Sequence, residues 1–181
     1  GYSEKDVLIV PISFRKEYDY FGYLKKMMLT LHNVKMMKKG RMPFHGAMFH
    51  LVLRNAGSSS VLLIGDSGAG KSETLEALRG IITDQVEDLV IIADDMGSID
   101  ILPDGRIVGY GTEIGAFVRM DDLQKDYAFG QIDRSIIMNP DKVNSRVVLP
   151  VTKFSSIVEG YDIDFVLYAN SLCRNDWNKS S

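Results

Sequence analysis

Residues 65–72 constrain the fold of this chain more than any other segment. They read Gly-Asp-Ser-Gly-Ala-Gly-Lys-Ser and match the pattern G-x-x-x-x-G-K-[ST] without a gap. The apolar run at 60–64 predicts a strand before this segment, and the apolar spacing after it predicts a helix over 71–82. A strand, a tight glycine-rich turn and a helix in this order direct successive backbone N–H groups at one anion. We therefore expect a phosphate-binding loop here.

The composition of this loop suits a nucleoside triphosphate. Its glycines let the backbone fold tightly, Lys71 would neutralise the β- and γ-phosphates, and the Ser72 hydroxyl would ligate Mg²⁺. The alternative is a glycine-rich turn that matches the pattern by chance. The residues expected to contact the nucleotide are Gly65, Asp66, Ser67, Gly68, Ala69, Gly70, Lys71, Ser72 and Glu73.

An acidic pair, Asp94-Asp95, directly follows the apolar run at 89–93. Such a continuous run is typical of a strand buried on both faces. A carboxylate at the carboxyl end of a buried strand beside a phosphate loop is well placed to hold the metal of a nucleotide. Two adjacent acids can also divide the work, because one can bind Mg²⁺ while the other holds a second metal or takes a proton. The alternative is a solvated loop after a strand.

The rest of the chain contains more predicted strands than helices. Further strands are expected at 7–12, 44–53, 99–102, 106–108, 135–138, 147–151 and 164–168, and a helix is expected over 18–37. Because the two types do not strictly alternate, we expect an α/β fold with a mixed β-sheet flanked by helices. A length of 181 residues predicts one domain, in which a strand and a helix at 1–40 lead into a core at 41–181.

Composition excludes several classes of function. The net charge of −3, from 21 basic and 24 acidic residues, argues against nucleic acid as the main partner. No apolar run reaches the roughly 18 residues of a membrane helix, and no secretory signal precedes the first strand. A single cysteine, Cys173, fits a reducing compartment, so we expect a cytoplasmic protein. The first residue is Gly1 and the end is abrupt, so we expect a piece of a longer chain.

Four other positions carry little signal by themselves. His45 begins the strand before the phosphate loop, where a single histidine is usually packed or at the surface. Lys25 and Lys26 lie in the first predicted helix, and their spacing alone favours a solvated position for both. Tyr20 alone would be predicted to lie in the core.

Taken together, these residues resemble the superfamily of phosphoenolpyruvate carboxykinase and HPr kinase/phosphorylase. Residues 20–26 are similar to the Y-G-G-E-M-K-K segment of ATP-dependent carboxykinases, and His45 is similar to the histidine of their M-H-x-S-A-N segment. Asp94-Asp95 resembles their G-D-D-E-H segment, and residues 144–150 resemble N-T-R-V-x-Y-P. The resemblance implies the phosphate-loop fold of the carboxykinase C-terminal, nucleotide-binding domain.

The resemblance also implies two metal sites. Lys26, His45 and Asp95 would hold a transition metal, which is Mn²⁺ in the carboxykinases. A lysine can ligate only as the neutral amine, so the nearby cation would have to lower its pKa. Ser72 and Asp94 would serve the Mg²⁺ of the nucleotide.

The activity implied by the resemblance is in-line transfer of the γ-phosphoryl group of ATP. Arg146 would neutralise charge at the γ-phosphate during transfer, and Tyr20 and Lys26 would lie near a small carboxylic substrate. In a carboxykinase the acceptor is the enolate left when oxaloacetate loses CO₂, which makes the enzyme a lyase. The residues implied in catalysis are Lys71, Asp94, Asp95, Arg146 and His45.

HPr kinase/phosphorylase is the second relative in this resemblance. Its sequence is closer around the loop, at His45-Gly46, at 65–68, at 70–74 and at 93–95. There the acceptor is a protein serine, so the alternative function is a kinase acting on a protein serine or a small-molecule hydroxyl. A third alternative, from a different class, is a non-catalytic ATP-binding module that regulates a larger protein.

Overall fold

The computed structural model of this chain describes residues 2–4, 7–13, 15, 21–65, 69–80, 85–119, 136–138 and 146–169. The strands within them are β1 (Tyr2–Glu4), β2 (Val7–Ile9), β3 (Met42–Leu53), β4 (Gly57–Gly65), β5 (Val86–Ala93), β6 (Met96–Ile101), β7 (Ile107–Gly111), β8 (Gly115–Arg119), β9 (Ile136–Met138), β10 (Arg146–Pro150), β11 (Tyr161–Asp162) and β12 (Phe165–Ala169). The helices are α1 (Phe21–Lys38), α2 (Lys71–Gly80) and α4 (Phe154–Val158). The described structure is therefore mostly β.

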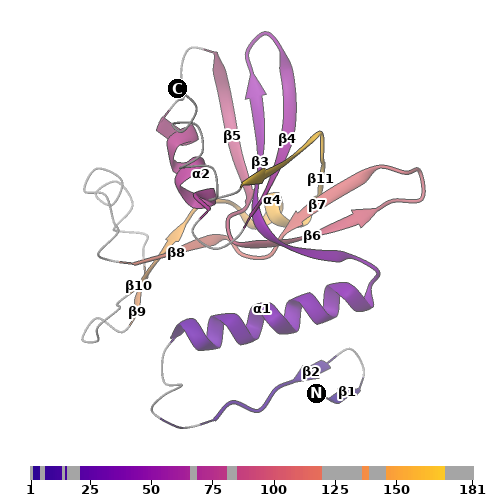
Figure 1. The fold of residues 1–181 in the computed structure, drawn as a ribbon, viewed down its shortest axis with the longest axis vertical. Coiled ribbons are helices and arrows are strands. Elements are labelled where there is room, and N and C mark those ends of the chain that lie inside the picture. The colour runs from indigo at the N-terminus through magenta and orange to yellow at the C-terminus, as the bar shows by residue number, and fades with distance from the viewer. Residues whose placement is uncertain are drawn as a thin grey trace, which may run out of the picture.

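Seven of the described strands form one mixed sheet (Figure 1). Their order is β11-β7-β6-β3-β4-β12, and β5 pairs with β3 beyond the end of β6. β12 runs parallel to β4, whereas the other neighbouring strands are antiparallel. The mixed sheet predicted from the sequence is thus confirmed. β8, β10 and β9 form a separate antiparallel sheet, and β1 pairs with β2.

Strand β3 organises the main sheet because it is long enough to hold different partners along its length. One edge pairs with β4 over 46–53. The other edge pairs with β6 over 42–45 and with β5 over 48–53. Because both edges are paired and both faces are covered, Ala47 and Met48 have no exposed surface.

Among the described residues, the core around β3 contains two apolar clusters that lie on opposite faces of this strand. Alternate residues of a strand point to opposite faces, which separates Phe44 and Met48 from Ala47 and Phe49. The first cluster contains Phe44, Met48, Leu62, Ile92, Ala93 and Ile99. The second contains Ala47, Phe49, Leu63, Leu75 and Ile91. Leu75 belongs to α2, so the second cluster fixes this helix against the sheet.

The helices lie around the sheet without forming two full layers. α1 crosses one end of the sheet, between it and the paired strands β1 and β2, and contacts β3 and β6 (Figure 1). α2 contacts β3 and β4, and α4 contacts β5 and β7. Because α4 has only five residues, the helix-flanked α/β architecture expected from the sequence is not clear in the described part of the chain.

Differences between predicted and observed elements have simple causes. β4 begins at Gly57, before the predicted residue 60, because pairing of Leu53 with Gly57 extends the ladder to the turn. β1, β8, β11 and α4 were not predicted. Each has five residues or fewer, a length at which the sequence pattern identifies some strands, such as β9, and misses others.

Candidate functional site

The segment predicted to bind phosphate leaves the sheet at Gly65 and enters α2 after Gly70. A Cβ atom on Gly65, the last residue of β4, would lie 2.6 Å from the carbonyl oxygen of Ala169 in the parallel strand β12. Gly70 has a φ of 85°, a left-handed conformation that favours glycine. Its carbonyl oxygen accepts hydrogen bonds from the amide and hydroxyl of Thr74, at 2.9 and 2.7 Å. Backbone geometry therefore explains both glycines that the pattern requires, Gly65 and Gly70.

Lys71, the first residue of α2, is buried with 7% of its surface exposed. Its ammonium group donates a 2.7 Å hydrogen bond to the carbonyl oxygen of Gly65, across the loop. Lysine is rarely buried, and a cation at the positive end of a helix is unfavourable by itself. An anion bound at this end of α2 would offset both costs, because the helix dipole and the ammonium both attract it.

The acidic pair lies at the same edge of the sheet as this loop. β4 and β5 both run antiparallel to β3, so they are parallel to each other and their carboxyl ends share one edge. At that edge Gly46 of β3 pairs with Ile64, and its amide donates a 3.1 Å hydrogen bond to the carbonyl oxygen of Asp95. Asp94 and Asp95 are therefore separated from the start of the loop by a single strand.

Close packing at Gly46 fixes this arrangement. A Cβ atom there would lie 2.5 Å from the carbonyl oxygen of Leu63, which is closer than side chains approach backbone. Glycine at this position thus lets β3 and β4 approach each other where the site forms. The preceding residue, His45, is brought to the same edge.

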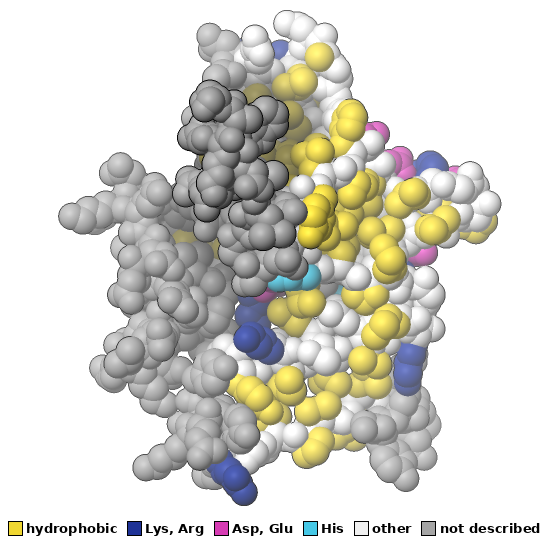
Figure 2. Space-filling view, viewed as in Figure 1, with side chains coloured by type: hydrophobic (Ala, Val, Ile, Leu, Met, Phe, Trp, Pro, Cys, Tyr) yellow, Lys and Arg dark blue, Asp and Glu magenta, His cyan; other side chains and the backbone are white. Residues whose placement is uncertain are grey.

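Four charged or titratable side chains form a chain of contacts at this edge. His45 Nε2 lies 3.1 Å from Asp95 Oδ1. Asp95 Oδ2 lies 3.3 Å from Lys25 Nζ, which also lies 3.2 Å from Glu113 Oε2. The space-filling view shows a histidine at the surface beside acidic and basic side chains, between the sheet and α1 (Figure 2). The contacts join residues from β3, from the β5–β6 junction, from α1 and from the segment before β8.

Glu113, like Lys25, is a member of this set of contacts that the sequence did not indicate. It lies between β7 and β8, in a glycine-rich stretch that matches no catalytic pattern. Burial raises the pKa of its carboxyl group; Lys25 opposes this, and Asp95 and Asp94 add to it. Its Oε1 atom is buried and accepts no hydrogen bond from the described residues. A half-buried carboxylate with one unsatisfied oxygen is a candidate ligand-binding group.

The structure brings Lys25, and not Lys26, to Asp95. Successive residues on a helix point about 100° apart, so two adjacent lysines cannot both face the same carboxylate. The Lys25 side chain is 15% exposed, whereas Lys26 is an exposed residue. The solvated position expected for Lys25 is therefore wrong, and the one expected for Lys26 is correct.

The described residues supply only part of the predicted metal sites. His45 Nε2 and Asp95 Oδ1, at 3.1 Å, have the spacing of two ligands that each lie about 2.1 Å from one ion. Within the described ranges, however, no group of three histidine, cysteine or acidic side chains could hold a metal. The pair therefore fits a transition metal as two ligands, and Asp94 is half-buried beside them.

Several predicted site residues lie outside the described structure. These are Tyr20, Asp66, Ser67 and Gly68, together with the side chains of Ser72, Glu73 and Arg146. The backbone of Arg146 opens β10, opposite Arg119 of β8 and Met138 of β9. Ser72 and Glu73 lie in the first turn of α2.

Comparison with known proteins finds no protein-family model and no curated protein that matches this chain. Among the helices of the described part, none is long and apolar enough to cross a membrane.

Proposed function

We propose that this chain is the nucleotide- and Mg²⁺-binding core of an ATP-dependent phosphotransferase. The observation that carries the proposal is the position of Lys71. Its buried ammonium group lies at the start of α2, at the sheet edge where Asp94 and Asp95 follow β5. A cation, a helix N-terminus and carboxylates at one edge are what a metal-bound triphosphate requires.

The proposal also includes a specific fold for this chain. A glycine-rich loop between a strand and a helix, beside a strand that ends in two acids, is consistent with the nucleotide-binding domain of the carboxykinase and HPr kinase superfamily. In that fold Asp94 and Ser72 would hold Mg²⁺, which supplies positive charge against the phosphates. Arg146 would add positive charge at the γ-phosphate.

The chain's own residues suggest how a proton is handled during transfer. If His45 Nε2–H donates to Asp95 Oδ1, as the 3.1 Å distance allows, the Nδ1 lone pair is left to accept a proton. The Asp95 carboxylate orients the imidazole ring. It also stabilises the positive charge that develops on the ring when Nδ1 takes the proton. The acceptor oxygen forms a bond to the γ-phosphorus while the bond from that phosphorus to ADP breaks.

One contact favours a hydroxyl acceptor over the carboxykinase reaction. The carboxykinase-type metal site needs the neutral amine of Lys26 beside Asp95, but Lys26 is exposed. The lysine that reaches Asp95 is Lys25, which lies within 3.3 Å of two carboxylates, Asp95 and Glu113. A protonated ammonium group held between two carboxylates has no lone pair to offer a metal. We therefore favour a kinase acting on a hydroxyl group, with a carboxykinase core as the alternative.

Phosphoryl transfer from γ-³²P-labelled ATP tests the proposal. The protein is incubated with Mg²⁺ alone or with Mn²⁺ added, and with oxaloacetate, alcohols or serine-containing proteins as acceptors. Labelled alcohol or protein formed with Mg²⁺ alone supports the hydroxyl kinase, whereas phosphoenolpyruvate formed only with Mn²⁺ supports the carboxykinase. If the protein binds ATP but transfers no phosphoryl group under any condition, the proposed activity is contradicted. The non-catalytic ATP-binding module would then be the remaining alternative.

A further inference from the structure

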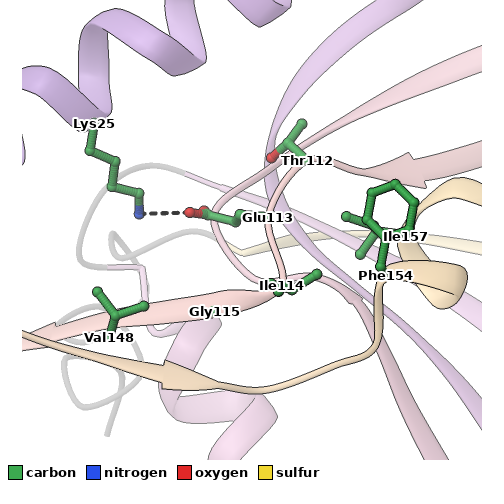
Figure 3. A pocket seen from close by; sticks show the side chains of 8 residues that line it. All are labelled: Lys25, Thr112, Glu113, Ile114, Gly115, Val148, Phe154 and Ile157. Atoms are coloured by element: carbon green, nitrogen blue, oxygen red, sulfur yellow. Dashed lines mark ion pairs between the residues drawn. The ribbon is translucent and has the colours of Figure 1, made fainter. Parts of the chain in front are cut away.

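A cavity of about 380 Å³ lies beside the Lys25–Glu113 ion pair (Figure 3). Its size falls within the range of small-molecule sites, which is about 300–1,000 Å³. Its wall combines the segment 112–115 with Val148 of β10 and with Phe154 and Ile157 of α4. Lys25 of α1 lines the end of the cavity where Glu113 lies.

The wall of this cavity is apolar except at one end. In the close view, Phe154 and Ile157 lie on the side opposite Lys25, with Ile114 between them and the ion pair (Figure 3). Ile157 is buried, whereas Phe154 is 68% exposed, an unusual exposure for an aromatic side chain at the edge of a cavity. A ligand with a compact apolar part would gain binding free energy by burying these side chains.

The polar end has a specific requirement. Glu113 Oε2 faces Lys25 at 3.2 Å, while the buried Oε1 atom accepts nothing from the described residues. An unsatisfied buried acceptor costs about 1–3 kcal/mol, which a hydrogen-bond donor on a ligand would recover. An ammonium ligand would be repelled by Lys25, and a carboxylate ligand by Glu113. A neutral hydroxyl group satisfies the oxygen without either repulsion.

We infer that this pocket binds a small alcohol with a compact apolar body, whose hydroxyl donates a hydrogen bond to Glu113 Oε1. Lys25 joins Glu113 to Asp95, so the pocket adjoins the edge where the triphosphate is proposed to bind. In a role that rests on the proposed function, this alcohol is the phosphoryl acceptor. Glu113 holds the hydroxyl before transfer; then the alcohol oxygen forms the bond to the γ-phosphorus, the bond to ADP breaks, and the hydroxyl proton passes to His45 Nδ1, the acceptor proposed above. The products are a phosphate monoester and ADP.

Methyl NMR titration with benzyl alcohol and toluene tests the pocket, because these probes share an apolar ring and differ in the hydroxyl group. Benzyl alcohol should shift the methyl signals of Ile114 and Ile157 and bind at least about tenfold tighter than toluene. Glu113→Leu should abolish this preference, and the exposed control Glu159→Gln should keep it. Equal affinities in the unmodified protein, or signals that do not move, would overturn the inference.

Two further variants keep the test decisive. Phe154→Ala changes an exposed side chain, so folding should be unaffected, and it should weaken both probes while leaving their ratio unchanged. Lys71→Met should lose ATP·Mg²⁺ binding but keep the benzyl alcohol titration. If the unmodified protein binds benzyl alcohol but not ATP, the proposed function fails and the pocket stands. If it binds ATP but shows no hydroxyl preference, the pocket inference fails alone.

Discussion

His45 Nε2 lies 3.1 Å from Asp95 Oδ1, a contact between residues that are 50 positions apart in the chain. β3 makes the contact possible because it pairs with β6 from Met42 to His45 and with β5 from Met48 onward. The Asp94-Asp95 junction therefore faces His45 and Gly46. This pair is the part of the site that backbone pairing determines most directly.

Replacing His45 should lower the rate of phosphoryl transfer without changing the affinity for ATP. His45→Asn removes a group that can accept a proton but leaves the phosphate loop unchanged. Phosphoryl transfer should fall by about 10²–10⁴-fold while ATP affinity stays the same. The measurement is the rate of labelled product formation beside the dissociation constant of ATP. A variant that transfers at the original rate would exclude His45 from proton transfer.

The adjacent lysines of α1 provide a matched pair of variants. Lys25→Met leaves Asp95 and the half-buried Glu113 without their shared cation. We expect it to lower the free energy of unfolding by about 1–3 kcal/mol, with most of the loss from Glu113, because Asp95 is 44% exposed.

Lys26→Met is the control, because Lys26 is exposed and should change stability by less than about 0.5 kcal/mol. Urea unfolding of both variants gives the comparison. Equal losses would contradict the placement of Lys25, and loss of activity only in the Lys26 variant would favour the carboxykinase site.

The sequence predicts the loop, the acidic pair and the mixed sheet because each depends on local chemistry. The phosphate loop needs glycines and a lysine between a strand and a helix, and β5 needs a continuous apolar run. The orientation of α1 shows the limit of such local patterns. Its apolar residues Leu24 and Met28 are 43% and 60% exposed, whereas Met36 is buried. Apolar residues occur on several sides of this helix, so the sequence does not specify its rotation.

That rotation decides which lysine reaches Asp95, and this explains why Lys25 could not be identified in advance. Glu113 could not be identified for a related reason. Its burial depends on α1, β10 and α4 meeting around the segment 112–115, and no local pattern encodes that meeting.

Two aspartates near β12 should differ in their contribution to stability. Asp164 accepts a 2.7 Å hydrogen bond from the amide of the buried Ser60 and donates its own amide to the Ser60 carbonyl at 3.0 Å. Asp164→Ala leaves the Ser60 amide without its acceptor and should cost about 1–3 kcal/mol in urea unfolding.

Asp162 pairs instead with Arg106, and both side chains are more than half exposed. Asp162→Ala should therefore cost clearly less than Asp164→Ala, since exposed ion pairs contribute little. A larger loss for Asp162→Ala would show that Asp164 does not hold β12 to β4.

Stability should fall as the pH drops below about 6.5, in part because of His32. Burial lowers the pKa of His32, and Arg41, Lys39 and Lys35 lower it further. The unfolded chain therefore binds more protons than the folded one between the lowered pKa and about 6.5, which favours unfolding as the pH falls through this range. Urea titrations of His32→Gln should show a shallower decline. A decline as steep as in the unmodified protein would exclude His32 as its cause.

Calorimetric titration with ATP and Mg²⁺ tests the central claim most directly, using Lys71→Met and the exposed control Lys38→Met. Losing a charged hydrogen-bond donor to phosphate should weaken ATP binding by at least about tenfold in the Lys71 variant. The Lys38 variant should bind as the unmodified protein does. Equal binding by all three proteins, or no binding by the unmodified protein, would contradict the assignment of a triphosphate to this loop.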